Sequence, residues 1–287
     1  MKQNKVQIRK ICGWILFLLS IGCFCMQIGY MFVHSRFQVE YSDNRIFYVV
    51  NIFCALCLGM AIYFLLKLAK KTKLIGIGIL VLFMIVNVGL LFYSNHQIKN
   101  IVSLSPDLKH VFSIKENTNT GEAIFYQTYF GILARPKERL PYATTQEFKV
   151  EWLAKDVAAV TYKAKDHSIH QYIGTFGNRG GEGYYYVGPS IYGHWKGNDI
   201  EVISNKEGIS VFSNGKKETF DWDHIVQFGT LAVVLTANDQ AVWTISLNEN
   251  FEVQSAADVP PTGEISLYKA TMEKTEPIIL YYESSNL

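Results

Sequence analysis

The stretch LIGIGILVLFMIVNVGLLFY, residues 74–93, is twenty residues long and has no charged side chain. Twenty helical residues rise about 30 Å, which is the thickness of the hydrocarbon core of a bilayer. Fourteen of them are Leu, Ile, Val or Phe. At about −0.3 to −0.6 kcal/mol each, these side chains favour insertion by roughly 4 to 8 kcal/mol, and the single amide of Asn87 does not offset that gain. The stretch predicts a membrane-spanning helix.

Two further apolar stretches precede this one, Ile11–Val33 and Ile46–Leu66, and neither contains a charged residue. A soluble helical hairpin can also be apolar on all sides, but three stretches of spanning length favour three transmembrane helices. A basic start followed by an apolar run is also typical of a secretory signal peptide. The first stretch is too long for one and lacks a small-x-small cleavage site, so we interpret it as a retained span.

Charge divides the chain into two unlike parts. Residues 1–94 carry ten Lys and Arg against two acids, whereas residues 95–287 carry seventeen against twenty-three. The basic residues of the first part gather at Lys2–Lys10 and Lys67–Lys73, which the positive-inside rule assigns to the cytoplasm. The sequence thus predicts a cytoplasmic tail (1–10), a three-helix membrane region (11–94) and an extracytoplasmic domain (95–287) of a multi-pass plasma-membrane protein.

All five cysteines lie in the first two spans, at Cys12, Cys23, Cys25, Cys54 and Cys57. The domain after the spans therefore cannot use disulfides or thiolate metal sites. At about 190 residues it is large enough to bury a core and fold without them.

Each span carries one strongly polar amide: Gln27, Asn51 and Asn87. Counted at about 1.5 Å per residue from the cytoplasmic ends, all three lie roughly 20 to 24 Å up the membrane. We predict that they make helix–helix contacts; the alternative is that they reach headgroup water. Because the three spans contain no Asp, Glu, Lys, Arg or His, they do not resemble a transporter path.

From Leu104 onward the sequence alternates apolar and polar residues between short turns, which predicts antiparallel strands. Asn214-Gly215 is the strongest turn signal, because both residues tolerate the positive φ of a type I′ turn. The expected fold is an all-β sandwich or barrel, with a partial propeller-like meander as the alternative. The expected strands are 111–115, 123–129, 148–153, 157–162, 200–204, 209–213, 216–220, 231–235 and 241–247.

Residues 171–197 interrupt this rhythm with eight glycines and many aromatic residues. Gly177–Gly181 does not fit a dinucleotide fingerprint or a P-loop. Tyr184, Tyr186 and Trp195 could present their rings to a glycan or a peptide, and they are our candidate ligand- or partner-binding residues. The alternative is a glycine-rich turn whose aromatic residues cover the core.

No pattern predicts a catalytic residue, a metal ligand or a cofactor. Asp221, Asp223 and His224 have metal-binding side chains, but a solvated strand edge explains them better. His167 and His170 are three residues apart, a helical spacing in a segment that otherwise predicts a strand. No Gly-x-Ser-x-Gly elbow occurs, and nothing indicates a nucleic-acid partner.

Tyr184–Trp195 and the run FDWDHIVQFGTLAVVL, residues 220–235, resemble uncharacterised multi-pass membrane proteins of low-GC Gram-positive bacteria. The resemblance implies a location and no chemistry. The expected function is an integral plasma-membrane protein whose external β domain binds a partner or a cell-envelope component. The alternatives are an envelope hydrolase or transferase with an unrecognised site, and an external sensor subunit.

Overall fold

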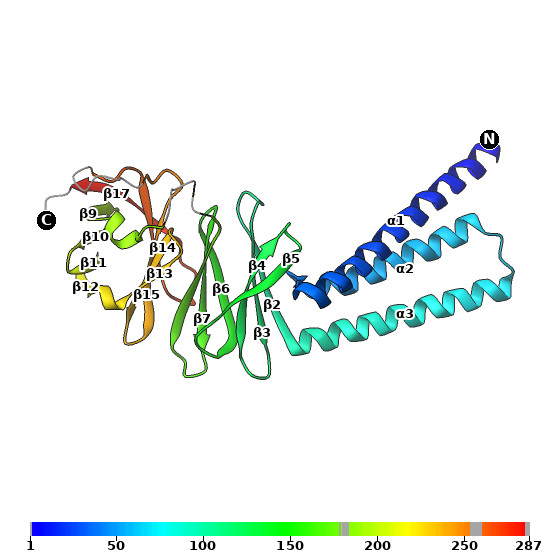
Figure 1. Ribbon diagram of the computed structural model, residues 1–287, viewed down its shortest axis with the longest axis horizontal. Coiled ribbons are helices and arrows are strands. Elements are labelled where there is room, and N and C mark those ends of the chain that lie inside the picture. Colours follow the sequence, from blue (N-terminus) through cyan, green and yellow to red (C-terminus); the bar gives the residue numbers. More distant parts are fainter. Residues whose placement is uncertain (1, 178, 180–183, 253–259, 285–287) are drawn as a thin grey trace. The chain divides into compact units, whose positions relative to one another are not determined.

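The computed structural model describes residues 2–177, 179, 184–252 and 260–284 (Figure 1). The chain forms two compact units, each with its own contacts. The first consists of Met1–Val102, Ser113–Thr120 and Ile124–Arg139, and the second of Ser103–Phe112, Gly121–Ala123 and Leu140–Leu287.

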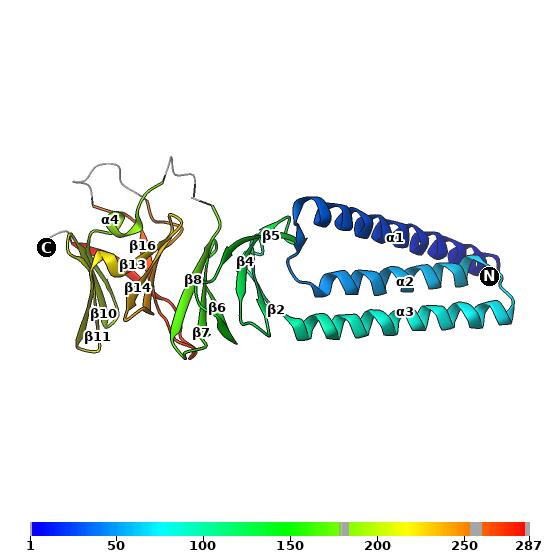
Figure 2. The ribbon, with the colours of Figure 1, turned by 60° about the horizontal axis from the view of Figure 1, so that its bottom comes forward.

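Three long helices dominate the first unit: α1 (Lys2–Phe37), α2 (Arg45–Leu65) and α3 (Lys70–Gln97). Each is long and apolar enough to cross a membrane. Helix α2 lies between α1 and α3 (Figure 2). Most of their outward side chains are large and apolar, as expected of surfaces that face lipid. The predicted class, three long apolar helices followed by antiparallel β structure, is confirmed.

A five-stranded antiparallel sheet continues from the helices, with strand order β1-β5-β4-β3-β2. Strand β1 is only two residues long and lies in the connection between α1 and α2, where Glu40 and Tyr41 pair with Ala134 and Leu133. The connection is thereby part of the sheet, so the helices and most of this sheet belong to one compact unit. The strands are β1 (Glu40–Tyr41), β2 (Ile98–Leu104), β3 (Val111–Asn117), β4 (Ala123–Tyr129) and β5 (Leu133–Arg139).

The second unit contains a three-stranded sheet, in the order β6-β7-β8, and a nine-stranded one, in the order β12-β11-β10-β9-β17-β16-β15-β14-β13. Two short helices, α4 (Val187–Ser190) and the 3₁₀ helix η1 (Trp222–His224), connect strands. The strands are β6 (Thr144–Ala154), β7 (Val157–Ala164), β8 (Ile169–Thr175), β9 (Gly193–Gly197), β10 (Ile200–Asn205), β11 (Gly208–Ser213), β12 (Lys216–Phe220), β13 (Ile225–Phe228), β14 (Ala232–Ala237), β15 (Gln240–Leu247), β16 (Glu264–Lys269) and β17 (Ile278–Ser284).

The nine strands curve around one apolar core into a nearly closed barrel. Strand β14 shows how this works, because side chains alternate between the two faces of a strand. Val233 and Leu235 point into the barrel core, whereas Ala232 and Val234 pack outward against Val157 and Ile173 of the three-stranded sheet. Each fully buried side chain of this kind contributes roughly 1.5 to 3 kcal/mol.

The turn at Asn214-Gly215 joins β11 to β12, with φ angles of 51° and 73°. The positive angles confirm the type I′ turn that the sequence predicts. Of the all-β architectures that the sequence allows, the nine-stranded sheet and its single core form a barrel and not a propeller.

Candidate functional site

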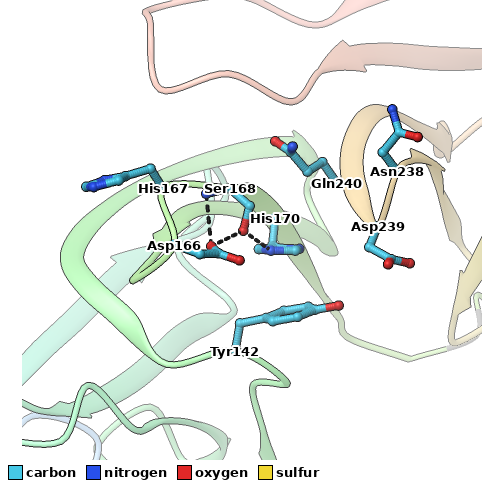
Figure 3. A pocket seen from close by; sticks show the side chains of 8 residues that line it. All are labelled: Tyr142, Asp166, His167, Ser168, His170, Asn238, Asp239 and Gln240. Atoms are coloured by element: carbon cyan, nitrogen blue, oxygen red, sulfur yellow. Dashed lines mark hydrogen bonds between the residues drawn. The ribbon is translucent and has the colours of Figure 1, made fainter.

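A polar pocket of about 380 Å³ lies in the second unit, beside the turns of the β7–β8 and β14–β15 hairpins (Figure 3). Three separate segments line it, one before β6, one around the β7–β8 turn and one around the β14–β15 turn. The lining residues are Tyr142, Asp166, His167, Ser168, His170, Asn238, Asp239 and Gln240.

Local sequence holds the two turns in shape. The Asp166 carboxylate accepts a hydrogen bond from the Ser168 backbone N–H at 3.0 Å, closing the β7–β8 turn. Asn238 and Asp239 adopt left-handed φ angles of 50° and 59°, which Asn and Asp tolerate better than most residues. The Gln240 side chain then accepts from the Ile169 backbone N–H at 3.2 Å, so the two hairpins are tied together.

Tyr142 and His170 form the aromatic part of the pocket. Their rings stack with centroids 3.7 Å apart and an angle of 14° between the planes. Tyr142 is 38% exposed, whereas His170 is 6% exposed. Burial lowers the pKa of His170, and the nearby Asp166 and Asp239 only partly oppose that effect. His170 is therefore neutral at pH 7.

The hydrogen-bond chain Asp166–Ser168–His170 has one consistent proton arrangement. The Ser168 hydroxyl contacts both the Asp166 carboxylate and His170 Nε2, the latter at 2.6 Å. The hydrogen bond from Ser168 lowers the pKa of Asp166, so this carboxylate is ionised and only accepts. The hydroxyl proton goes to Asp166, and His170 Nε2 must donate to Ser168. An imidazole that carries its proton on Nε2 cannot act as a base toward that hydroxyl.

The structure separates the three aromatic residues that the sequence singled out. Tyr184 and Tyr186 are each 63% exposed, and their rings meet edge to face at 5.5 Å. Trp195 is fully buried in the barrel core, and its indole N–H donates to the Ile191 carbonyl at 2.8 Å. Trp195 therefore cannot offer its ring to a ligand, which corrects that part of the expectation. Ligand binding by Tyr184 and Tyr186 stays a prediction, and residues 180–183 beside them lie outside the described part of the chain.

The three amides of the spans contact neighbouring helices in different ways. Asn51 on α2 donates to the Asn87 side chain on α3 at 3.3 Å. Gln27 on α1 donates instead to the Phe47 carbonyl of α2 at 3.0 Å and accepts from the Tyr41 hydroxyl. Asn51 and Asn87 are thus hydrogen-bonded to each other, whereas Gln27 is hydrogen-bonded to the backbone at the start of α2.

Replacing Asn51 with leucine is expected to reduce stability in detergent by about 0.6 to 2 kcal/mol. The reason is that Asn87 is only 5% exposed and would lose the donor to its side-chain carbonyl. Reversible unfolding in mixed micelles measures the change. Phe53→Leu, at a position 49% exposed on the same helix, is the matched control. Equal stability of the two variants would show that the amide pair does not hold α2 against α3.

Asp221 and His224 form a local cap rather than a metal site. The Asp221 carboxylate accepts from the His224 backbone N–H and from its ring Nδ1, which closes η1 where the sequence suggested a strand edge. Among the described residues, no group of three or more His, Cys, Asp or Glu side chains is arranged so that it could hold a metal ion. His167 and His170 line the pocket, but the sequence alone gave no reason to connect them with Tyr142 or Asp239.

Comparison of the chain with protein-family models, with characterised proteins and with solved structures gives no match. Function is therefore inferred from the geometry: three apolar helices of spanning length, β structure behind them, and a polar pocket with an aromatic wall.

Proposed function

We propose that this chain is a multi-pass plasma-membrane protein that holds its β structure outside the cytoplasm, and that the pocket binds an amine-bearing sugar of the cell envelope. The proposed orientation is supported by the charges that flank the spans. Four lysines lie at 67–73, one in the connection between α2 and α3 and three in the first turn of α3, and a further basic cluster precedes the first span. By the positive-inside rule both belong in the cytoplasm, which leaves the end of α3 and the strands after it on the other side.

The side chains of the pocket carry the proposal for a sugar ligand. Asn238 and Gln240 supply amides, and Asp166 and Asp239 supply carboxylates, all within one small space beside a tyrosine ring. Amides and carboxylates hydrogen-bond hydroxyl groups, while an aromatic ring covers an apolar face of a ligand. Asp166 and Asp239 bring two carboxylates to the pocket, and none of the residues that line it is a lysine or an arginine, so a protonated amine on the ligand is favoured over an acidic group.

An envelope hydrolase is the second candidate and has less support. The serine and histidine in the pocket are close enough for nucleophilic chemistry, but Asp166 contacts the serine and not the histidine. In a hydrolytic triad the carboxylate orients the histidine, which then removes the serine proton. The arrangement in this pocket stabilises a turn and offers polar groups to a ligand.

Fluorescent glucosamine trisaccharide tests the proposal on intact cells that express the full chain and on inverted membrane vesicles from them. We expect intact cells to bind the probe and inverted vesicles to fail. The matched N-acetylated trisaccharide, which lacks the positive charges, should bind more weakly. Tyr142→Ala should weaken binding about tenfold, equivalent to about 1.4 kcal/mol.

Tyr192→Ala is the control, because Tyr192 is 37% exposed, close to the value for Tyr142, and lies outside the pocket. Binding confined to inverted vesicles would overturn the orientation and leave the pocket assignment intact. Equal binding of both trisaccharides would contradict the role of the carboxylates. If Tyr142→Ala binds the probe as well as Tyr192→Ala does, the pocket is not the binding site.

A further inference from the structure

The turn between β4 and β5 carries an unusual set of exposed side chains. Phe130 is 96% exposed, and Tyr129 and Ile132 beside it are 47% and 44% exposed. Phe130 and Gly131 have φ angles of 53° and 74°, in the left-handed region, within a three-residue connection between the paired residues Tyr129 and Leu133. The left-handed region is sterically unfavourable for phenylalanine, and exposure of its apolar ring to water costs free energy.

A second turn in the same chain shows which residue type is typical at a position with positive φ. Asn214-Gly215, the two-residue connection between Ser213 and Lys216, also has two positive φ angles, 51° and 73°, and its first position carries Asn, which tolerates the left-handed region better than most residues. The backbone of the β4–β5 turn therefore does not require phenylalanine. Core packing does not require it either, since Phe130 is nearly fully exposed. An apolar environment outside the protein would explain the residue.

The position of the turn supplies that environment. Ser42, in the connection between α1 and α2, donates its backbone N–H to the Ile132 carbonyl at 2.9 Å and its hydroxyl to the Gly131 carbonyl at 3.3 Å. Helix α2 has 21 residues, about 30 Å, so its whole length is needed to cross the hydrocarbon core. The connection that enters α2, and the turn bonded to it, then lie in the headgroup layer.

We propose that the β4–β5 turn, residues 129–132, inserts its aromatic and aliphatic side chains into the interfacial layer of the bilayer beside α1 and α2. Tyrosine is enriched at this depth because its ring is apolar and its hydroxyl can reach water, which suits Tyr129. Phenylalanine and aliphatic side chains such as Phe130 and Ile132 bury apolar area at the headgroup–acyl boundary. Arg135 lies on β5 with its guanidinium 5.8 Å from the ring of Phe37, the last residue of α1. A cation at this level suits lipid phosphates.

Photo-crosslinking in phospholipid vesicles tests this inference with the full chain. Benzoyl-phenylalanine replaces Phe130, which keeps an aromatic side chain, and in separate variants it replaces Phe92 or Lys137. Phe92 is the positive control, since it is 70% exposed on α3. Lys137 is the matched negative control, since it lies on β5 about 13 Å farther along the strand than Leu133.

After irradiation we expect the peptide that contains position 130 to gain the mass of one phospholipid, as at position 92, and the peptide with position 137 to gain none. A reaction at position 92 without one at position 130 would overturn the inference. Crosslinking of position 130 to a second copy or to another protein, in place of lipid, would also overturn it. The result is independent of the sugar-binding proposal, because the turn belongs to the first unit and the pocket to the second.

Discussion

Replacing Glu40 with alanine is expected to lower the free energy of unfolding by about 3 to 5 kcal/mol. Glu40 accepts from the Lys115 ammonium at 2.5 Å, and the Lys115 side chain is only 4% exposed. Asn44 accepts a second hydrogen bond from the ammonium at 2.7 Å, and the Tyr126 ring lies 4.5 Å from it. Without Glu40 the buried ammonium would keep its desolvation penalty and lose its counter-charge. Reversible unfolding in mixed micelles measures the loss.

The double variant Glu40→Ala/Lys115→Met separates the charge from the packing. Methionine keeps much of the length of lysine and needs no counter-charge, so the double variant should recover part of the stability that Glu40→Ala loses. If the double variant is no more stable than Glu40→Ala, an unpaired charge is not the cause of the loss.

The deficit of Glu40→Ala should also shrink as the pH rises. Burial lowers the pKa of Lys115, and Glu40 opposes that effect in the native chain. Without Glu40 the pKa of Lys115 in the folded state falls further below the unfolded value of about 10.4. Between those two pKa values the unfolded state binds more protons, so stability increases with pH. The loss should be largest near neutral pH and smallest near pH 10, and a loss that is constant over this range would contradict the assignment.

Trp195→Ala is expected to destabilise the second unit by about 3 to 5 kcal/mol. The Trp195 side chain is fully buried in the barrel core, where it packs against Phe251 and Tyr282. Alanine leaves a large cavity that the surrounding strands can fill only in part. The Trp195 indole N–H also donates to the Ile191 carbonyl, which would lose this hydrogen bond in the variant. Thermal or denaturant unfolding of the full chain detects the effect.

Tyr184→Ala is the control for this experiment, since Tyr184 is 63% exposed. An exposed side chain away from special backbone features changes stability by about 0.5 kcal/mol or less. The two variants thus distinguish a core residue from a surface residue within one aromatic segment. A stable Trp195→Ala variant would contradict the assignment of Trp195 to the core.

Lys115 and the groups around it, Glu40, Asn44 and the Tyr126 ring, explain how the helices and the first sheet hold together. Strand β1 is too short to form a stable pairing alone, and it comes from a connection of only a few residues. The buried ion pair joins this connection to β3, and the Ser113 hydroxyl adds a bond to the Ser42 carbonyl at 2.7 Å. The sheet is thereby fixed to the connection between the end of α1 and the start of α2. This is where we propose that the β4–β5 turn enters the interfacial layer.

Secondary structure was largely predictable, because it depends on local patterns. The expected strands 123–129 and 216–220 agree with β4 and β12 to the residue, and the Asn214-Gly215 turn has the expected backbone. Several strands are absent from the expected set, namely β1, β2, β5, β9, β13, β16 and β17. Strand β5 is missed because Arg135, Pro136 and Lys137 are not typical strand residues. Its pairing with β4 and β1 overrides that local preference.

The pocket could not be predicted, because its parts are far apart in the sequence. Asn238 and Asp239 lie between the expected strands 231–235 and 241–247, and the sequence relates His170 only to His167, three residues before it. Three segments around Tyr142, His170 and Asp239 meet because the β7–β8 and β14–β15 hairpins are tied through Gln240 and Ile169. The contact between these segments depends on how the sheets pack, and no regular residue spacing in the sequence indicates it.

The sequence by itself determined the three apolar helices, the β class of the chain after them and the positions of nine strands, since length, hydropathy and period act locally. The tertiary structure alone decided that Trp195 is core, that Lys115 is buried against Glu40, and that Phe130 is exposed beside the α1–α2 connection. An aromatic ring or a lysine has the same local pattern in either place. The difference lies in the set of neighbours that folding brings to each side chain, and those neighbours determine whether it packs, pairs or faces lipid.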